Sequence, residues 1–323
     1  MKRIYLLLLF NLCLLLGSTV VAQQNVNHKW GKPSQLEWSL QAWGEAPDAE
    51  AAVLYKTMTV TYQVNRSFAS YSDANTLLNT SSIEHLGTNE NVDAIMNCDV
   101  RMRIKILKDS GTGYANIGIL YYNEEADSKR FDELERVRVV VYRQNEKGKV
   151  THRNIDAKTY VDTRADAHYM MRKVLVPDVQ KGDIIEYQYS ITSSRYAFLY
   201  ECSFQEDIPL MYVKCDMDIP AFLQFDMKVP VHPFVKSKVV PGAISGPQRS
   251  DFKAPDRYPS NHYTIEGHDI MPKGLDLQRS EAEAARVQAT SGAVMSTRAT
   301  LKLNTQPPAP MPEGTKSIVL NVK

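Results

Sequence analysis

Three cysteines, Cys98, Cys202 and Cys215, are the candidate nucleophiles beyond the apolar N-terminal segment of the chain. A nucleophilic cysteine needs a histidine base and usually lies exposed at the start of a helix. Cys202 and Cys215 instead fall on the apolar phase of alternating segments, and no helical pattern follows Cys98. The chain also has no Gly-x-Ser-x-Gly elbow, no His-Glu-x-x-His motif and no Cys-x-x-Cys pair. We therefore predict no catalytic residue and no enzymatic activity.

Cys202 and Cys215 could instead form a disulfide. Both occupy inward positions of segments that we expect to be neighbouring strands, and a hairpin about Ile208 to Leu210 would bring them face to face. An oxidising compartment permits this bond, but an odd number of cysteines leaves one thiol over. The alternative is that both are free thiols buried as small apolar side chains.

Asp162, Asp166 and His168 form the one cluster that resembles a set of metal ligands. Their spacing fits no defined motif and no second group of ligands lies nearby in the chain, so we predict no metal site. Gly111 and Gly113 form a Gly-x-Gly turn, but a phosphate-binding loop needs a following helix and a lysine. The sequence therefore predicts no bound cofactor.

The elements that carry these residues show the alternation of apolar and polar residues that is typical of half-buried strands. Three consecutive segments, 185–191, 198–204 and 213–219, follow it, and we expect three successive antiparallel strands. Residues 100–106 also alternate, and their Arg and Lys residues are expected on a solvated face rather than in an anion-binding site. The fold class is therefore predicted to be mainly β, an antiparallel β-sandwich-like domain with a few short helices. Further strands are expected within 47–62, 114–122, 131–142, 150–161, 222–229, 299–303 and 317–322.

Ser34 and Glu37 are spaced as a capping box and predict a short helix. The tryptophans around it, Trp30, Trp38 and Trp43, could form a sugar-binding platform or pack as an amphipathic segment on the sheet. Residues 66–92 and the Pro- and Gly-rich stretch from Pro230 onward are predicted as loops. A second short helix is expected over residues 280–289.

The N-terminus predicts export from a bacterial cell. Residues 1–22 contain a basic start, an apolar run and a small-residue cleavage site, which together are typical of a signal peptide. We expect a periplasmic or extracellular protein with no membrane span after cleavage. The formal net charge of +1 favours no nucleic-acid partner. The remainder is predicted to divide into a β-sandwich-like domain (23–235) and a region of loop, short helix and edge strands (236–323), which could be a divergent or truncated second β part.

Four segments together resemble an exported bacterial family, the domain of unknown function 3857, which usually precedes a transglutaminase-like domain. They are Asp48–Tyr55 (DAEAAVLY), Arg103–Tyr122, Val176–Thr192 (VPDVQKGDIIEYQYSIT) and Gln205–Pro220 (QEDIPLMYVKCDMDIP). The resemblance implies a non-catalytic, β-sandwich-like domain. The catalytic triad of the family's longer members follows such a domain and has no match in this chain, so no catalytic residue is transferred.

These observations favour a secreted binding or scaffolding module for an unknown protein or a cell-envelope ligand. Two alternatives remain open from the sequence. One is an accessory fragment of a transglutaminase-like or cysteine-protease-like enzyme whose catalytic domain is absent or separately encoded. The other is a carbohydrate-binding sandwich that uses the three tryptophans.

Overall fold

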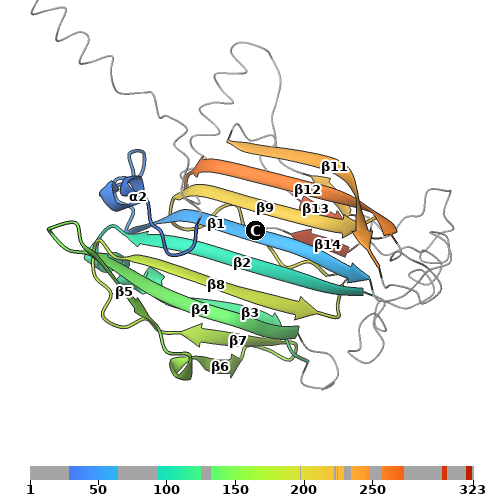
Figure 1. Cartoon of the computed structure of the whole chain (residues 1–323), viewed down its shortest axis with the longest axis horizontal. Helices are drawn as coiled ribbons and strands as arrows, with labels where there is room; N and C mark the ends of the chain where they lie inside the picture. The colour runs from blue at the N-terminus through green and yellow to red at the C-terminus, as the bar shows by residue number, and fades with distance from the viewer. Residues whose placement is uncertain are drawn as a thin grey trace, which may run out of the picture.

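The computed structural model of the chain is mainly β (Figure 1). It describes residues 29–64, 94–124, 132–196, 198–221, 223, 225–228, 234–246, 257–272, 300–303 and 318–321. One short α-helix, α2 (Gln35–Ser39), and two 3-10 turns, Asp109–Ala115 and Ala157–Thr159, accompany the strands. The strands are β1 Ala51–Val64, β2 Ala94–Ile106, β3 Ile117–Tyr122, β4 Asp132–Gln144, β5 Val150–Asn154, β6 Val161–Arg164, β7 Tyr169–Val174, β8 Ile184–Ser193, β9 Leu210–Pro220, β10 Phe225–Lys228, β11 Val235–Ser245, β12 Arg257–Ile270, β13 Thr300–Leu303 and β14 Ile318–Asn321.

Eight strands form the large sheet, in the order β11-β12-β9-β1-β2-β8-β4-β5. All its neighbouring pairs are antiparallel except β1 and β9, which run parallel. A small sheet, β3-β7-β6, and a third sheet, β10-β13-β14, complete the described strands. The predicted fold class is therefore confirmed. None of the described helices is long and apolar enough to cross a membrane.

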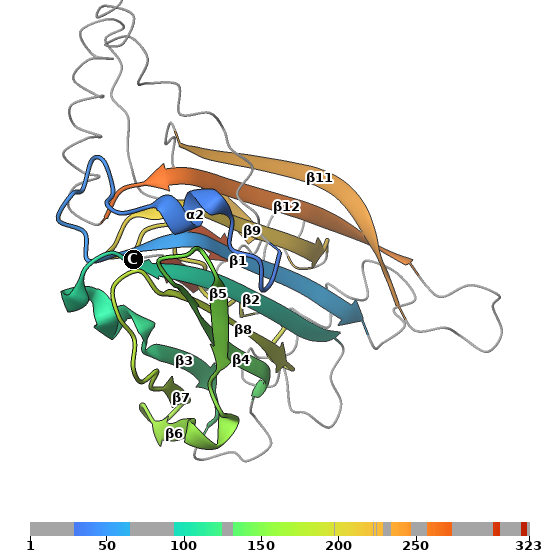
Figure 2. The same ribbon diagram turned by 60° about the vertical axis from the view of Figure 1, so that its left-hand side comes forward.

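The small sheet packs against one face of the large sheet and makes the second layer of the fold (Figure 2). Ile117 and Ile119 of β3 and Val174 of β7 lie in one core cluster with Ile104 of β2 and Ile185 of β8. Burial of these branched side chains between two layers is the main stabilising contribution expected of such a fold. Toward β9 and β12, the same face is covered by the connection that follows β8, through Tyr196 and Leu199.

The prediction of three successive antiparallel strands is wrong in two respects. Residues 198–204 form no strand but belong to the connection between β8 and β9. β9 does not lie beside β8, since it pairs with β1 and β12 on the far side of β2. A parallel partner requires the chain to cross over the sheet, and the alternating aromatic residues of this crossover pack onto the core. The alternation of aromatic and other residues in the sequence therefore appears here without strand geometry.

The basic residues of β2 are also placed differently from the prediction. Arg101 is exposed as expected, but Arg103 and Lys105 are 0% and 2% exposed. The N-terminal segment that contains α2 covers this end of the outer face of the large sheet. Glu186 of β8, which pairs with Arg103 under the same cover, is also 0% exposed. Local alternation cannot reveal a cover that comes from 60 or more residues away in the chain.

The cover is held by a buried charge cluster. Arg103 Nη1 donates to both carboxylate oxygens of Glu37 at 2.7 and 2.9 Å, and Arg103 Nη2 donates to Glu186 Oε1 at 2.7 Å. Gly31 N–H donates to Glu186 Oε2 at 2.8 Å, and the Tyr55 hydroxyl donates to Glu186 Oε1. The predicted capping box between Ser34 and Glu37 is present in α2. Glu37 therefore both caps the helix and fastens it to the sheet.

Part of the stretch predicted as loop is an ordered hairpin. β11 and β12 pair over eleven residues and join the large sheet through β9. β11 is an edge strand whose two faces are both largely exposed, so it lacks the alternation that identifies a strand. Pro241 fits such an edge because proline lacks the N–H that a central strand donates. The signal peptide (1–22), the loop at 66–92 and the helix at 280–289 lie outside the described residues.

Candidate functional site

The three cysteines gather on the inner face of the large sheet. Cys98 and Cys215 are buried in β2 and β9, and Cys202 lies in the crossover. The hairpin expected to join Cys202 and Cys215 is absent, but the crossover still brings the two together as free thiols. The hydrogen bond from the Cys215 thiol raises the pKa of Cys215 and lowers the pKa of Cys202. A disulfide between them stays a prediction.

The three residues that resembled metal ligands have separate partners. Asp162 accepts two hydrogen bonds from Arg172, at 2.8 and 2.6 Å. Asp166 Oδ1 accepts the backbone N–H of His168 and of the next residue, which forms a tight turn. His168 Nδ1 lies 3.5 Å from Glu124. Within the described part of the chain, no three His, Cys, Asp or Glu side chains are grouped as metal ligands.

The tryptophans of the N-terminal segment form no exposed platform. Trp38 and Trp43 are 7% and 8% exposed and belong to core clusters on the outer face of the large sheet. Trp30 is half-buried beneath the Arg138 guanidinium, 5.2 Å from its ring centroid. These rings therefore pack the cover onto the sheet, and stacking on a sugar would require the two buried rings to be uncovered.

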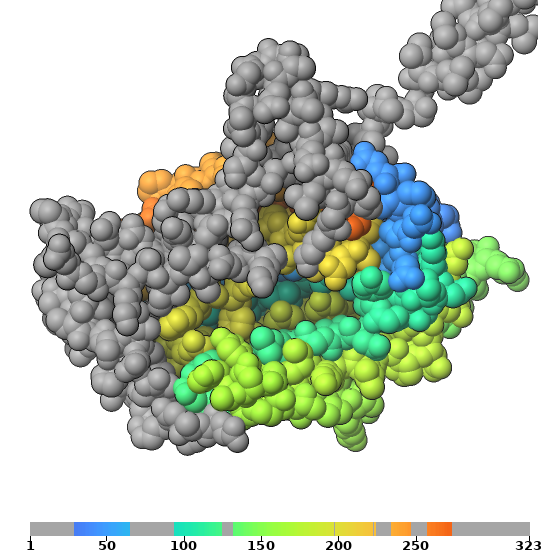
Figure 3. Space-filling view, turned by 180° about the vertical axis from the view of Figure 1, so that it is seen from behind, coloured from blue at the N-terminus to red at the C-terminus, as the bar shows by residue number. Residues whose placement is uncertain are grey.

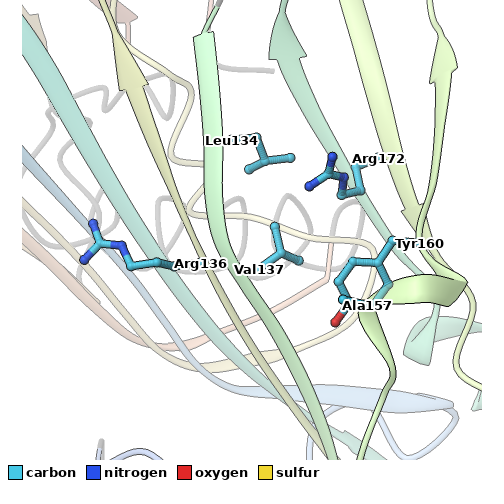
Figure 4. Close-up of a pocket in the computed structure, with 6 residues that line it drawn as sticks. All are labelled: Leu134, Arg136, Val137, Ala157, Tyr160 and Arg172. Carbon is cyan, nitrogen blue, oxygen red and sulfur yellow. The ribbon is translucent and has the colours of Figure 1, made fainter.

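A pocket of about 220 Å³ lies between β4 of the large sheet, β7 of the small sheet and the 3-10 turn segment 157–160. Seen from behind, the small sheet forms a ridge beside a recessed surface (Figure 3). The pocket is lined by Leu134, Arg136, Val137, Ala157, Tyr160 and Arg172 (Figure 4). Clefts at the junction of two packed layers are common ligand sites, although this one is smaller than the ~300–1,000 Å³ of most drug-sized pockets.

A β-bulge in β4 creates the space. The register with β8 shifts between Glu135 and Arg138, and Arg136 adopts a φ of 52°. In a regular strand, Arg136 would point to the same face as Leu134, toward the small sheet. In the bulge its side chain extends to the other side of β4, where it meets Asp99, and Val137 points inward instead (Figure 4). Bulges that redirect a side chain are enriched beside functional sites, as are non-glycine residues with positive φ.

Arg172 supplies the cationic group of the pocket. Its Nε and Nη2 atoms donate to Asp162, whose hydrogen bonds raise the pKa of the guanidinium, so Arg172 is charged at any physiological pH. Tyr160 lines the wall with its ring while its hydroxyl donates to the carbonyl of Ile155 at 3.4 Å. Burial raises the pKa of Tyr160, so its phenol is neutral. The pocket therefore combines the apolar side chains of Leu134, Val137 and Ala157 with the fixed positive charge of Arg172.

A second polar cluster joins β3, β4 and the crossover. Asp132 Oδ2 accepts the N–H of Tyr122 at 3.0 Å and the hydroxyl of Tyr200. The Arg195 guanidinium lies 3.5 Å from the centroid of the Tyr122 ring and 4.4 Å from that of Phe198. Burial raises the pKa of Asp132, which is 3% exposed. Because its members bond one another across three elements, this cluster serves to anchor the crossover.

Sequence reasoning missed the pocket. Residues 136–142 (RVRVVVY) alternate as a regular strand would, and nothing in them marks the bulge, since no glycine stands at the position with positive φ. Arg172 and Tyr160 come from segments that are adjacent to β4 only in space. The pocket lies between two sheets and depends on a local break in the register of β4 with β8 within one of them. Such a pocket has no signature in a single sequence.

Comparison with known proteins finds one family model that matches the central part of the chain. Residues 93–250 match the model of a family described as a domain of unknown function with solved structure, DUF3857. This is the family that the motifs resemble, and the predicted resemblance is confirmed over that range. No curated protein matches the chain.

Several solved structures are similar to the chain at low identity. A crystal structure of a candidate protease from Parabacteroides distasonis aligns with 75% of this chain at 14% identity and a TM-score of 0.37. An M1 zinc metallopeptidase from Deinococcus radiodurans aligns with 68% of this chain at 8% identity and a TM-score of 0.25. The alignments cover 47% and 44% of those longer chains, so this chain spans less than half of their length.

Proposed function

We propose that the chain is an exported, non-catalytic binding module and that the pocket between β4, β7 and residues 157–160 is its ligand site. The observation that carries the proposal is the bulge at Arg136, which removes a long side chain from the interface of the two layers and leaves a lined cavity. A close-packed interface is the more stable arrangement, so a retained cavity beside a strained residue is a mark of function. The partner would be a cell-envelope component or an exported protein.

Two features support binding over catalysis. Burial raises the pKa of the Cys98 thiol, so this cysteine is protonated and a poor nucleophile. The thiols of Cys202 and Cys215 are hydrogen-bonded to each other at the core of the large sheet. The residues that line the pocket are three apolar residues, a tyrosine and two arginines, which is a set suited to holding a ligand rather than to transferring protons.

The test is a titration of the full chain carrying ¹³C-labelled Leu and Val methyl groups. The probes are four six-carbon compounds that differ only in their polar end: hexanol, hexanamide, hexanoate and hexylamine. We expect at least one probe to produce saturable shifts of the Leu134 and Val137 methyl signals, since both side chains line the pocket.

Ala157→Phe places a ring inside the pocket and should abolish these shifts. Ala165→Phe is the matched control, because Ala165 is exposed in the turn after β6 and does not line the pocket. The proposal fails if no probe shifts the two methyl signals, or if the shifts persist unchanged in the Ala157→Phe variant.

A further inference from the structure

We propose that the ligand of this pocket carries a carboxylate next to a short apolar group, and that the outer edge of the Arg172 guanidinium binds the carboxylate. This inference rests on the proposed function and names the class of molecule that the same site takes.

Arg172 presents a preformed fork to the pocket. Its Nε and one N–H of Nη2 are engaged by the two oxygens of Asp162, which fixes the plane of the guanidinium. The remaining N–H groups, on Nη1 and Nη2, donate no hydrogen bond to another described residue. This second edge has the planar, two-donor geometry that matches a carboxylate. Figure 4 shows the Arg172 side chain on the same side of β4 as Leu134 and Val137.

Among the described residues, no second carboxylate lines the pocket. None of the six residues that line the pocket is acidic, and Asp162 is already held by the opposite edge of Arg172. Arg172 keeps about a quarter of its side chain exposed, so an incoming anion can reach it without unfolding the site. A carboxylate that accepts two N–H groups from one edge of a guanidinium forms a charge-assisted interaction of the stronger kind.

The walls and the size restrict the rest of the ligand. The side chains of Leu134, Val137 and Ala157 are apolar, and the Tyr160 hydroxyl is directed to Ile155. A cavity of about 220 Å³ admits a group the size of one apolar amino-acid side chain or a short acyl chain. The C-terminal residue of an apolar peptide and a short fatty acid share this chemistry.

The test compares hexanoate with hexanamide, which have the same apolar chain and nearly the same shape, on the labelled full chain. We expect hexanoate to bind about tenfold or more tightly than hexanamide, because only the acid forms a charge-assisted pair. Arg172→Gln should lower the affinity for hexanoate to that for hexanamide and leave the affinity for hexanamide unchanged. N-acetyl-leucine and N-acetyl-leucinamide then distinguish a peptide-like ligand from an acyl chain.

Two control variants separate contact with the ligand from a structural role. Lys173→Gln removes the neighbouring cation of β7 and should leave the preference for the acid intact. Asp162→Asn frees the inner edge of Arg172 but keeps its charge, so hexanoate should bind as well as before or better. If Asp162→Asn abolishes the preference as Arg172→Gln does, the ion pair only holds the sheet together and the proposal is overturned.

The outcomes for the two proposals are distinct. If hexanoate and hexanamide produce equal shifts and Ala157→Phe removes both, the proposal of a carboxylate ligand is overturned. The proposal that the chain is a binding module is then still supported. Tighter binding of hexylamine than of hexanoate would have the same meaning. No shift by any probe would remove both proposals together.

Discussion

Replacing Arg103 by methionine tests how the N-terminal cover is held on the sheet. Arg103 is fully buried and is the cation between two buried carboxylates, Glu37 and Glu186, at 2.7 Å from each. Its guanidinium also lies 4.7 Å from the centroid of the Tyr55 ring. Methionine would fill much of the volume but leave two negative charges facing each other in the same closed site.

The expected loss of stability is large. Removing one partner of a buried ion pair costs about 3–5 kcal/mol, mainly because the remaining charge keeps its desolvation penalty. For a protein of this size each kcal/mol shifts the midpoint of thermal unfolding by about 2–4 °C, so Arg103→Met should lower it by roughly 6–20 °C. Urea unfolding followed by tryptophan fluorescence would measure the free energy directly, since Trp30 and Trp38 pack beside the cluster.

Arg101→Met is the matched control. Arg101 lies two residues earlier on the same face of β2 but is exposed, and exposed substitutions usually change stability by less than ~0.5 kcal/mol. A difference between the two variants of less than ~1 kcal/mol would refute the reasoning, because the cluster would then contribute no more than a surface ion pair.

Three further predictions concern separate features. Burial lowers the pKa of Lys105 to about 8, whereas in the unfolded chain the pKa is ~10.4. Between these two values the unfolded chain binds more protons than the folded chain, so the free energy of unfolding should rise with pH. The expected rise is about 2 kcal/mol from pH 7.5 to 9.5. Lys105→Met should abolish that rise in urea titrations, and an unchanged slope would contradict the assignment. A β-carbon on Gly111 would lie 2.2 Å from the Glu50 carbonyl oxygen, so Gly111→Ala should destabilise by ~2 kcal/mol or more, whereas Gly113→Ala, with open space around it, should be nearly neutral in the same assay. After treatment with oxidised glutathione, peptide mass spectrometry should find Cys202 joined to Cys215 and Cys98 alkylated only after unfolding; alkylation of all three in equal measure would rule out the bond.

The parts of the fold that were predictable are those with a local cause. β4, β8 and β9 lie where alternation placed strands, and the capping box of α2 follows from the spacing of Ser34 and Glu37. The buried face of Arg103 and Lys105 was not predictable, because its cover comes from a distant segment. The crossover at 198–204 has the sequence pattern of a strand, because its aromatic residues occur at alternate positions and pack, partly buried, against the core of the large sheet.

The candidate site lay beyond single-sequence reasoning for a different reason. The bulge at Arg136 depends on the pairing of β4 with β8, and Arg172 approaches through a sheet whose existence is itself a long-range property. Local patterns record which residues are apolar but not how two strands slip by one position. The thiol pair shows the intermediate case, since Cys202 and Cys215 do meet although the expected hairpin is absent.

The parallel pairing of β1 with β9 has a consequence for how the chain is made. β1 lies inside the large sheet between β2 and β9. The first residue of β9, Leu210, pairs with Val53 of β1. At the usual ~5–20 residues per second, the ribosome needs on the order of ten seconds or more to synthesise the intervening chain. During that interval one edge of a fourteen-residue, largely apolar strand has no partner. Such an edge is a template for aggregation, so this chain should depend on chaperones, or on transport before folding, until β9 has emerged.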